Sequence, residues 1–245
     1  MREDLYDAWH AIQWAAHQTT QLQERFLQWQ RRHPYKLDME IRREEPDWKY
    51  LVAYPKTPLD PLIYGDFGST VNSIRTALDL TMSALLIRNG HSPNSDALFP
   101  IRKEETEFYK RIDGFQAKGW ITLGEADIIR KTKAYKGGDH LLYHLHKLDI
   151  LRKHERLIEV VPAIANANLT AFGPGIEPHP ERLEGRTVLY RFPASYPFTP
   201  MPGNTLLTSE LLINEPEIVE FERPAITALN VYRERAKAIV LSFSN

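Results

Sequence analysis

Asn72, Arg75 and Asp79 are the residues whose types and spacing best suit chemistry on an anion. Arg75 and Asp79 are four residues apart in a stretch with helical periodicity, so their side chains share one helix face. Arginine before aspartate is the weaker order for supporting a single helix, so local helix support explains the pair poorly. Two interpretations follow: an ion pair that joins this helix to a neighbour, or an arginine that holds a phosphate or a transition-state anion while Asp79 orients it.

A second group lies in DHLLYHLHKLDILRKHERL, residues 139–157. Between Arg130 and Arg156 the chain has eight Lys or Arg residues, three acidic residues and four His. This local excess of positive charge is typical of a segment that binds an anionic partner, although a solvated helix face has the same composition. Asp149 and Lys153 are four apart in the favourable order, which also suits simple helix support.

The sequence therefore predicts two kinds of site residue. An arginine, its aspartate partner and a histidine that could transfer protons are the catalytic candidates, because unperturbed imidazole titrates near neutral pH: Arg75, Asp79 and His154. Polar residues on the same two segments are the binding candidates: Asn72, Asp149, Arg152 and Lys153.

Metal, cofactor and covalent chemistry have little support in the sequence. His140 and His144 are spaced as a helical metal pair, but Leu141 occupies the position where the HExxH zinc motif has glutamate. GDFGST at 65–70 lacks the phosphate-loop pattern, and no GxSxG motif occurs. The chain has no Cys, which excludes thiol nucleophiles, disulfides and iron–sulfur clusters. We therefore expect no metal and no cofactor.

Charge and hydropathy limit the classes of partner. The 245 residues include 31 Lys and Arg against 32 Asp and Glu, so the net charge of −1 gives no overall field for binding nucleic acid or anionic lipid. The beginning, MREDLYDAWH, has acidic residues where a signal peptide has its apolar stretch. No apolar run of about 18 residues occurs, as a membrane-spanning helix would need. We expect a cytoplasmic protein with no membrane partner.

Proline placement and periodicity predict the elements that must position these residues. No Pro occurs between Pro100 and Pro162, whereas ten of the 17 lie from Pro162 to Pro224, so the first stretch can be helical and the second mostly cannot. Apolar residues at three- and four-residue steps predict helices, and alternation or β-branched runs predict strands. The expected helices span 3–32, 62–88, 104–117, 124–134, 138–156 and a closing segment after Pro224, and the expected strands lie at 35–43, 48–54, 165–172, 188–192 and 205–213.

This order predicts an α+β fold: a helical bundle with a long N-terminal helix, central helices and a closing C-terminal helix, carrying an early β-hairpin and a strand-rich segment. We expect one domain over residues 1–245. Within it, 1–160 is mainly helical with the hairpin near 35–55, 161–223 is rich in strands and loops, and 224–245 is the closing helix.

Three segments carry a family resemblance: VNSIRTALDLTMSALL at 71–86, LFPI at 98–101 and LHKLDILRKHERL at 145–157. Over residues 62–160 they resemble a group of bacterial proteins of uncharacterised function with the pattern NLRSALDHL, FPI and a DKHR-like helix. The first helix also resembles the Arg-x4-His signature of the HEPN superfamily. Its members are all-α, usually dimeric, and include metal-independent ribonucleases. The family's arginine maps to Arg75, but Leu80 occupies the histidine position.

Leu80 separates two functional hypotheses. Because an isobutyl group cannot transfer a proton, the sequence favours a non-catalytic cytoplasmic binding or regulatory module built on a HEPN-like bundle. The alternative is a metal-independent HEPN-like ribonuclease that uses Arg75, with His154 supplying the missing imidazole from the neighbouring helix. The resemblance and the basic segment imply RNA or another protein as partner, and a homodimer as the assembly.

Overall fold

The computed structural model describes residues 2–32, 34–169, 176–183, 185–197, 205–216, 218 and 223–244. Its contacts divide the chain into two compact units. The helical unit comprises Met1–Glu24, Pro61–Val160 and Leu212–Asn245, and the β unit comprises Arg25–Asp60 and Val161–Leu211. The predicted α+β class is confirmed, with a long N-terminal helix, an early hairpin and strands before the final helix.

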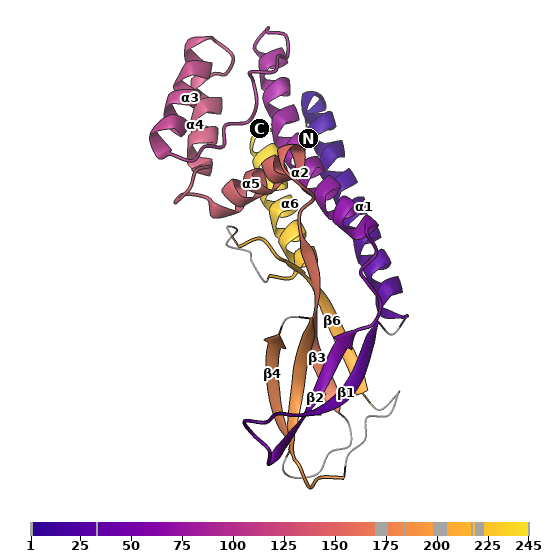
Figure 1. Cartoon of the computed structure of the whole chain (residues 1–245). Coiled ribbons are helices and arrows are strands. Elements are labelled where there is room, and N and C mark those ends of the chain that lie inside the picture. The colour runs from indigo at the N-terminus through magenta and orange to yellow at the C-terminus, as the bar shows by residue number, and fades with distance from the viewer. Residues whose placement is uncertain are drawn as a thin grey trace. The chain divides into compact units, whose positions relative to one another are not determined.

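The helices follow the predicted segments closely (Figure 1). After a short 3-10 helix, η1 (Glu3–Leu5), they are α1 (Tyr6–Gln30), α2 (Leu62–Arg88), α3 (Glu105–Ala117), α4 (Leu123–Thr132), α5 (His140–His154) and α6 (Ala225–Ser242). No helix in the described part of the chain is both long enough and apolar enough to cross a membrane.

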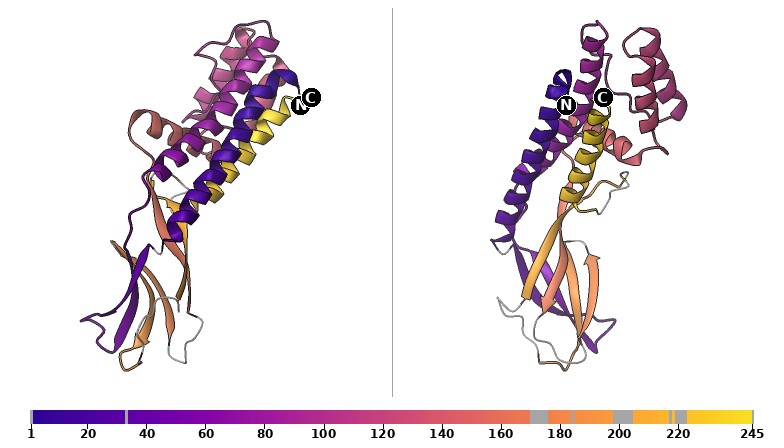
Figure 2. Two further views of the ribbon diagram at one scale, coloured as in Figure 1. Left: turned by 90° about the vertical axis from the view of Figure 1, so that its right-hand side faces the viewer. Right: turned by 180° about the vertical axis from the view of Figure 1, so that it is seen from behind.

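The core of the helical unit is organised around α2. Its apolar stripe is fully buried, because it packs against α5 on one side and α6 on another. α2 ends at Asn89 and Gly90, and Gly90 has a φ of 80°, the left-handed conformation that glycine adopts most readily after a helix. The two ends of the chain lie at the same end of this unit, as both views of Figure 2 show.

The periodicity of residues 138–156 predicts that Leu141, Leu145, Leu148 and Leu151 face the core, and the observed buried face of α5 differs from this prediction. Leu145 and Leu148 are buried as expected, but Leu142 replaces Leu141 in the core and Leu151 is half-buried. Compared with the prediction, α5 is therefore rotated about its own axis. As a result, polar residues beside its apolar face, including the buried Asp149, pack against the neighbouring α2. Asp139 caps its beginning by accepting a hydrogen bond from the Leu142 N–H at 3.1 Å.

The β unit contains a four-stranded antiparallel sheet in the order β1-β2-β5-β4, and a two-stranded pair, β3-β6. The strands are β1 (Tyr35–Ile41), β2 (Trp48–Pro55), β3 (Val160–Leu169), β4 (Glu177–Leu183), β5 (Arg186–Pro193) and β6 (Thr205–Ile213). Residues 170–172 of the predicted strand at 165–172 lie outside the described residues. One sheet face buries Leu51, Ala53, Leu189 and Phe192.

Two features of the β unit differ from expectation. The prediction places the hairpin within the mainly helical part, residues 1–160. In the structure β2 pairs with β5, so β1 and β2 belong to the same compact unit as the strand-rich segment. The Gly and Pro residues of AFGPGIEPHP, residues 171–180, predict a turn-rich loop, but Glu177–Leu183 forms the strand β4. It is an edge strand, where a missing N–H leaves no gap in the hydrogen-bonded ladder. The extent of a single domain over 1–245 stays a prediction.

Candidate functional site

Arg75 and Asp79 form the ion pair that their spacing indicated, and both also hold Phe99. The Arg75 side chain is 4% exposed, and its Nη2 lies 3.0 Å from Asp79 Oδ1. The same nitrogen donates to the Phe99 carbonyl oxygen at 2.9 Å, while the Phe99 N–H donates to Asp79 Oδ1 at 2.9 Å. The pair therefore binds both backbone groups of one residue and fixes the loop after α2 against that helix.

The α5 residues lie against this pair. Lys153 Nζ donates to Asp149 Oδ2 at 2.6 Å, and Asp149 is 3% exposed. Arg152 Nη2 donates across to Asn72 Oδ1 on α2 at 3.0 Å, and its Nε is 3.9 Å from Asp149 Oδ1. Asp149 also acts electrostatically on both members of the Arg75 pair. We call this group of six residues the α2–α5 cluster: Asn72, Arg75, Asp79, Asp149, Arg152 and Lys153.

Burial dominates the electrostatics of the pair at the centre. It raises the pKa of Asp79, which the attraction of Arg75 and the Phe99 N–H oppose. It also lowers the pKa of Arg75, against the attraction of Asp79 and Asp149. Each partner therefore depends on the other, because a buried charge without its partner is strongly unfavourable.

His146 belongs with the cluster, although the sequence did not single it out as a site residue. Burial, together with the positive charges of Arg75, Arg102, Lys153 and Lys147, lowers its pKa from 6.5 to about 4. The imidazole is therefore neutral at neutral pH. Its Nδ1 is buried, with no hydrogen-bond partner among the described residues. His146, Asp149 and Lys153 are spaced at i, i+3 and i+7, which places them on one helix face. This spacing is the feature of the sequence from which His146 could have been assigned to the site.

The cluster has more positive than negative charge, and buried polar atoms within it, two donors and one acceptor, have no hydrogen-bond partner among the described residues. Three cationic side chains, Arg75, Arg152 and Lys153, face two carboxylates, Asp79 and Asp149, which leaves an excess of one positive charge. In the described part of the molecule the unpaired donors are Arg75 Nη1 and Arg152 Nε, and the unpaired acceptor is Asp149 Oδ1, which lies 3.9 Å from Arg152 Nε. Arg152 and Lys153 are 27% and 40% exposed, so the cluster reaches solvent on this side.

Six of the seven predicted site residues are thus brought together, and His154 is not. It is the last residue of α5 and is exposed. No hydrogen bond, ion pair or ring contact that the described structure contains joins it to the cluster. Leu80, at the family's histidine position, is half-buried on α2. The histidine that does interact with Arg75 is His146.

Two other places are poorer candidates. The His140 and His144 rings are 6.1 Å apart, but no group of three or more His, Asp or Glu residues among those described could hold a metal ion. A pocket of about 720 Å³ is lined by Arg2, Glu3, Asp4, Ile87 and Arg88.

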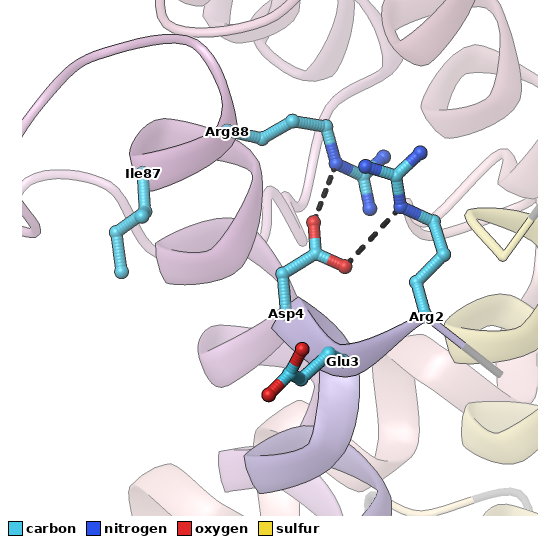
Figure 3. A pocket seen from close by; sticks show the side chains of 5 residues that line it. All are labelled: Arg2, Glu3, Asp4, Ile87 and Arg88. Atoms are coloured by element: carbon cyan, nitrogen blue, oxygen red, sulfur yellow. Dashed lines mark hydrogen bonds and ion pairs between the residues drawn. The ribbon is translucent and has the colours of Figure 1, made fainter.

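In that pocket both guanidinium groups are directed at the Asp4 carboxylate, as Figure 3 shows. Arg88 Nε donates to Asp4 at 2.7 Å, and its Nη groups reach Glu125 at 3.2 Å and the Phe243 carbonyl oxygen at 3.3 Å. The charges here neutralise one another and fasten the two chain ends to α2, so a structural role explains them.

The α2–α5 cluster has the composition of an oxyanion site. Guanidinium and ammonium groups donate charge-assisted hydrogen bonds to phosphate, and a neutral imidazole can accept a proton or a hydrogen bond. No protein-family model, curated protein or solved structure matches this chain, so its assignment depends on the geometry of the cluster.

Proposed function

We propose that this protein is a non-catalytic cytoplasmic binding or regulatory module whose α2–α5 cluster binds a phosphate group. One observation carries the proposal: Arg75 and Arg152 keep buried nitrogen donors without acceptors, in a cluster with an excess positive charge. Buried donors that no acceptor satisfies cost about 1–3 kcal/mol each, and a bound oxyanion would remove that cost.

Phosphate suits the cluster better than a carboxylate does. Its tetrahedral oxygens can accept from several donors at once, and the planar guanidinium of arginine matches pairs of them. Its higher negative charge also offsets the excess positive charge more fully. Within the proposal, the bundle is HEPN-like, the phosphate belongs to RNA or to a protein partner, and the chain assembles as a homodimer. The three quoted motifs and the basic segment support these finer points.

Calorimetric titration with inorganic phosphate tests the proposal. Arg152→Gln removes one partly exposed cation from the cluster, and Lys131→Gln removes one exposed cation from α4 as the matched control. We expect wild type to bind phosphate at constant ionic strength, and Arg152→Gln to bind about tenfold more weakly, as loss of one charge-assisted hydrogen bond implies. Absence of binding by wild type, or equal weakening by both variants, would refute the proposal.

The ribonuclease hypothesis remains a second proposal because of one electrostatic interaction. His146 interacts electrostatically with the buried Arg75, so the alternative no longer needs His154. In that mechanism neutral His146 is the base and Arg75 stabilises the anion. RNA cleavage with a chelator present tests it, using His146→Gln beside His154→Gln. Cleavage lost only in the first variant would support catalysis, whereas folded wild type that cleaves nothing would contradict it.

A further inference from the structure

Arg102 extends the positive charge of the cluster along the loop after α2. Its backbone is fixed, because its N–H donates to the Ala134 carbonyl oxygen at 3.1 Å and it forms a parallel bridge with Tyr135. Its half-buried side chain donates from Nη1 to the Ile101 carbonyl oxygen at 3.0 Å. Among the described residues it forms no ion pair with an acid.

Arg111, on α3, continues the same series. Its guanidinium lies over the Phe115 ring, 4.6 Å from the centroid, and its Nη2 donates to the Asp96 carbonyl oxygen. Its Nε is buried and has no hydrogen-bond partner in the described structure. Like Arg102, it has no ion-pair partner within those residues. Two further cations are therefore fixed in place by carbonyl oxygens and a ring rather than by carboxylates.

Arg102 is close enough to Arg111 and to Arg75 for the charges of each of these two pairs to repel. Burial lowers the pKa of Arg102, and the positive charge of Arg111 lowers it further, while the negative charge of Glu107 opposes both. The positive charge of Arg102 in turn lowers the pKa of Arg75 and the pKa of His146. The hydrogen bonds bring all three arginines to the loop between α2 and α3: Arg75 donates to the Phe99 carbonyl oxygen, Arg111 donates to the Asp96 carbonyl oxygen, and Arg102 belongs to that loop.

Arginines elsewhere in the helical unit show the opposite behaviour. Hydrogen bonds to carboxylates raise the pKa of Arg130 and Arg156, and Asp4 and Glu125 do the same for Arg88 despite its burial. The fold thus pairs its structural arginines with acids. Arg102 and Arg111 lack such partners, which points to a counter-ion supplied by a ligand.

We propose that Arg102 and Arg111 form a second anionic subsite, so that the ligand is a linear oligophosphate with at least two linked phosphate groups. This inference rests on the phosphate site of the proposed function, because the α2–α5 cluster binds the first phosphate, and it assigns that phosphate to a small molecule in place of RNA or a protein partner. The excess of one positive charge in the cluster and the charges of Arg102 and Arg111 add up to three, and the carboxylate of Glu107, which acts on Arg102, offsets part of this sum. The positive charge that remains suits a multiply charged anion such as pyrophosphate. Free pyrophosphate and the phosphate chain of a nucleotide share this chemistry.

The burial of the subsites favours a small ligand over a nucleic-acid backbone. Arg75 is 4% exposed and Arg102 is half-buried, so the end of a short phosphate chain can approach them more closely than a continuous backbone can. The net charge of −1 also provides no extended field for a polyanion.

Titrations with phosphate, pyrophosphate and tripolyphosphate at one ionic strength test the inference. We expect pyrophosphate to bind wild type at least about tenfold more tightly than phosphate, as a second set of charge-assisted hydrogen bonds implies. Arg111→Gln should lose that gain while its affinity for phosphate stays within about twofold. Lys110→Gln, an equal loss of charge at the neighbouring exposed residue of α3, should keep the gain.

The outcomes separate this inference from the proposed function. Phosphate binding without a gain for pyrophosphate, or an equal effect of Arg111→Gln and Lys110→Gln, would overturn the second subsite and leave the first. Absence of phosphate binding would overturn the proposed function itself. Binding of a 5′-hydroxyl RNA more tightly than pyrophosphate, with the same dependence on Arg111, would replace the oligophosphate with a nucleic acid. Arg102→Gln, beside Lys103→Gln, repeats the test at the other arginine.

Discussion

Acid should destabilise this protein through His146. Burial and the nearby cations Arg75, Arg102, Lys153 and Lys147 lower its pKa from 6.5 to about 4. The folded state therefore keeps this imidazole neutral at pH values where the unfolded chain binds a proton. Because the unfolded state then holds more protons, the free energy of unfolding falls as the pH decreases from about 6.5 to about 4. Above about pH 7 the imidazole is neutral in both states, and its contribution does not change.

The size of the effect follows from the two pKa values. One pKa unit corresponds to about 1.4 kcal/mol, so a histidine with these values lowers the free energy of unfolding by about 2 kcal/mol at pH 5, relative to pH 7.5. At pH 4 the loss reaches about 3 kcal/mol. His146→Gln keeps a polar side chain without a titrating group and should remove this part of the pH dependence.

Urea unfolding at pH 7.5 and pH 5 measures the effect in wild type, His146→Gln and His154→Gln. His154 is the matched control, since it lies on the same helix but is exposed. We expect the variant at 146 to lose about 2 kcal/mol less than wild type between the two pH values, and the variant at 154 to behave like wild type. Equal losses in wild type and His146→Gln would refute the burial of a neutral histidine beside Arg75.

Three substitutions test the ion pairs of the helical unit by denaturant unfolding. Arg75→Ala should lower the free energy of unfolding by about 3–5 kcal/mol, because it leaves Asp79 buried without its partner. An unchanged denaturation midpoint would contradict the role of this pair in fixing the loop after α2. Arg88→Ala should cost about 2 kcal/mol through lost charge-assisted hydrogen bonds, and full stability would show that the chain ends are held otherwise. Glu215→Ala should also cost about 2 kcal/mol, since buried Glu215 accepts from Arg156 at 2.9 and 2.7 Å; an unaltered curve would exclude this ion pair in solution.

The helices could be predicted because their periodicity is long and ends at clear signals. The apolar stripe of α2 repeats over its whole length and stops at Asn89-Gly90, so its predicted bounds, 62–88, equal the observed ones. The strands were harder, because pairing depends on residues far apart in the sequence. Nothing local in β2 indicates that it pairs with β5, more than a hundred residues later.

The site could be predicted in part for a similar reason. Spacing along one helix gave the Arg75–Asp79 pair and grouped the polar residues of α5. Whether His146 or His154 lies near Arg75 depends on the rotation of α5 about its axis. Packing of α5 against α2 and α6 determines that rotation. The contribution of Phe99 is a backbone interaction, which no side-chain pattern can predict.

Phosphate titration followed by NMR of arginine side chains tests the central claim most directly, because it locates the bound anion. The account predicts that the Nε–H signal of Arg152 and the backbone N–H signal of Phe99 shift together and saturate at one phosphate concentration. The Nε–H signals of Arg88 and Arg156, whose guanidinium groups already pair with carboxylates, should stay in place. Shifts of similar size at all of these arginines, or none at Arg152, would contradict a phosphate site in the α2–α5 cluster.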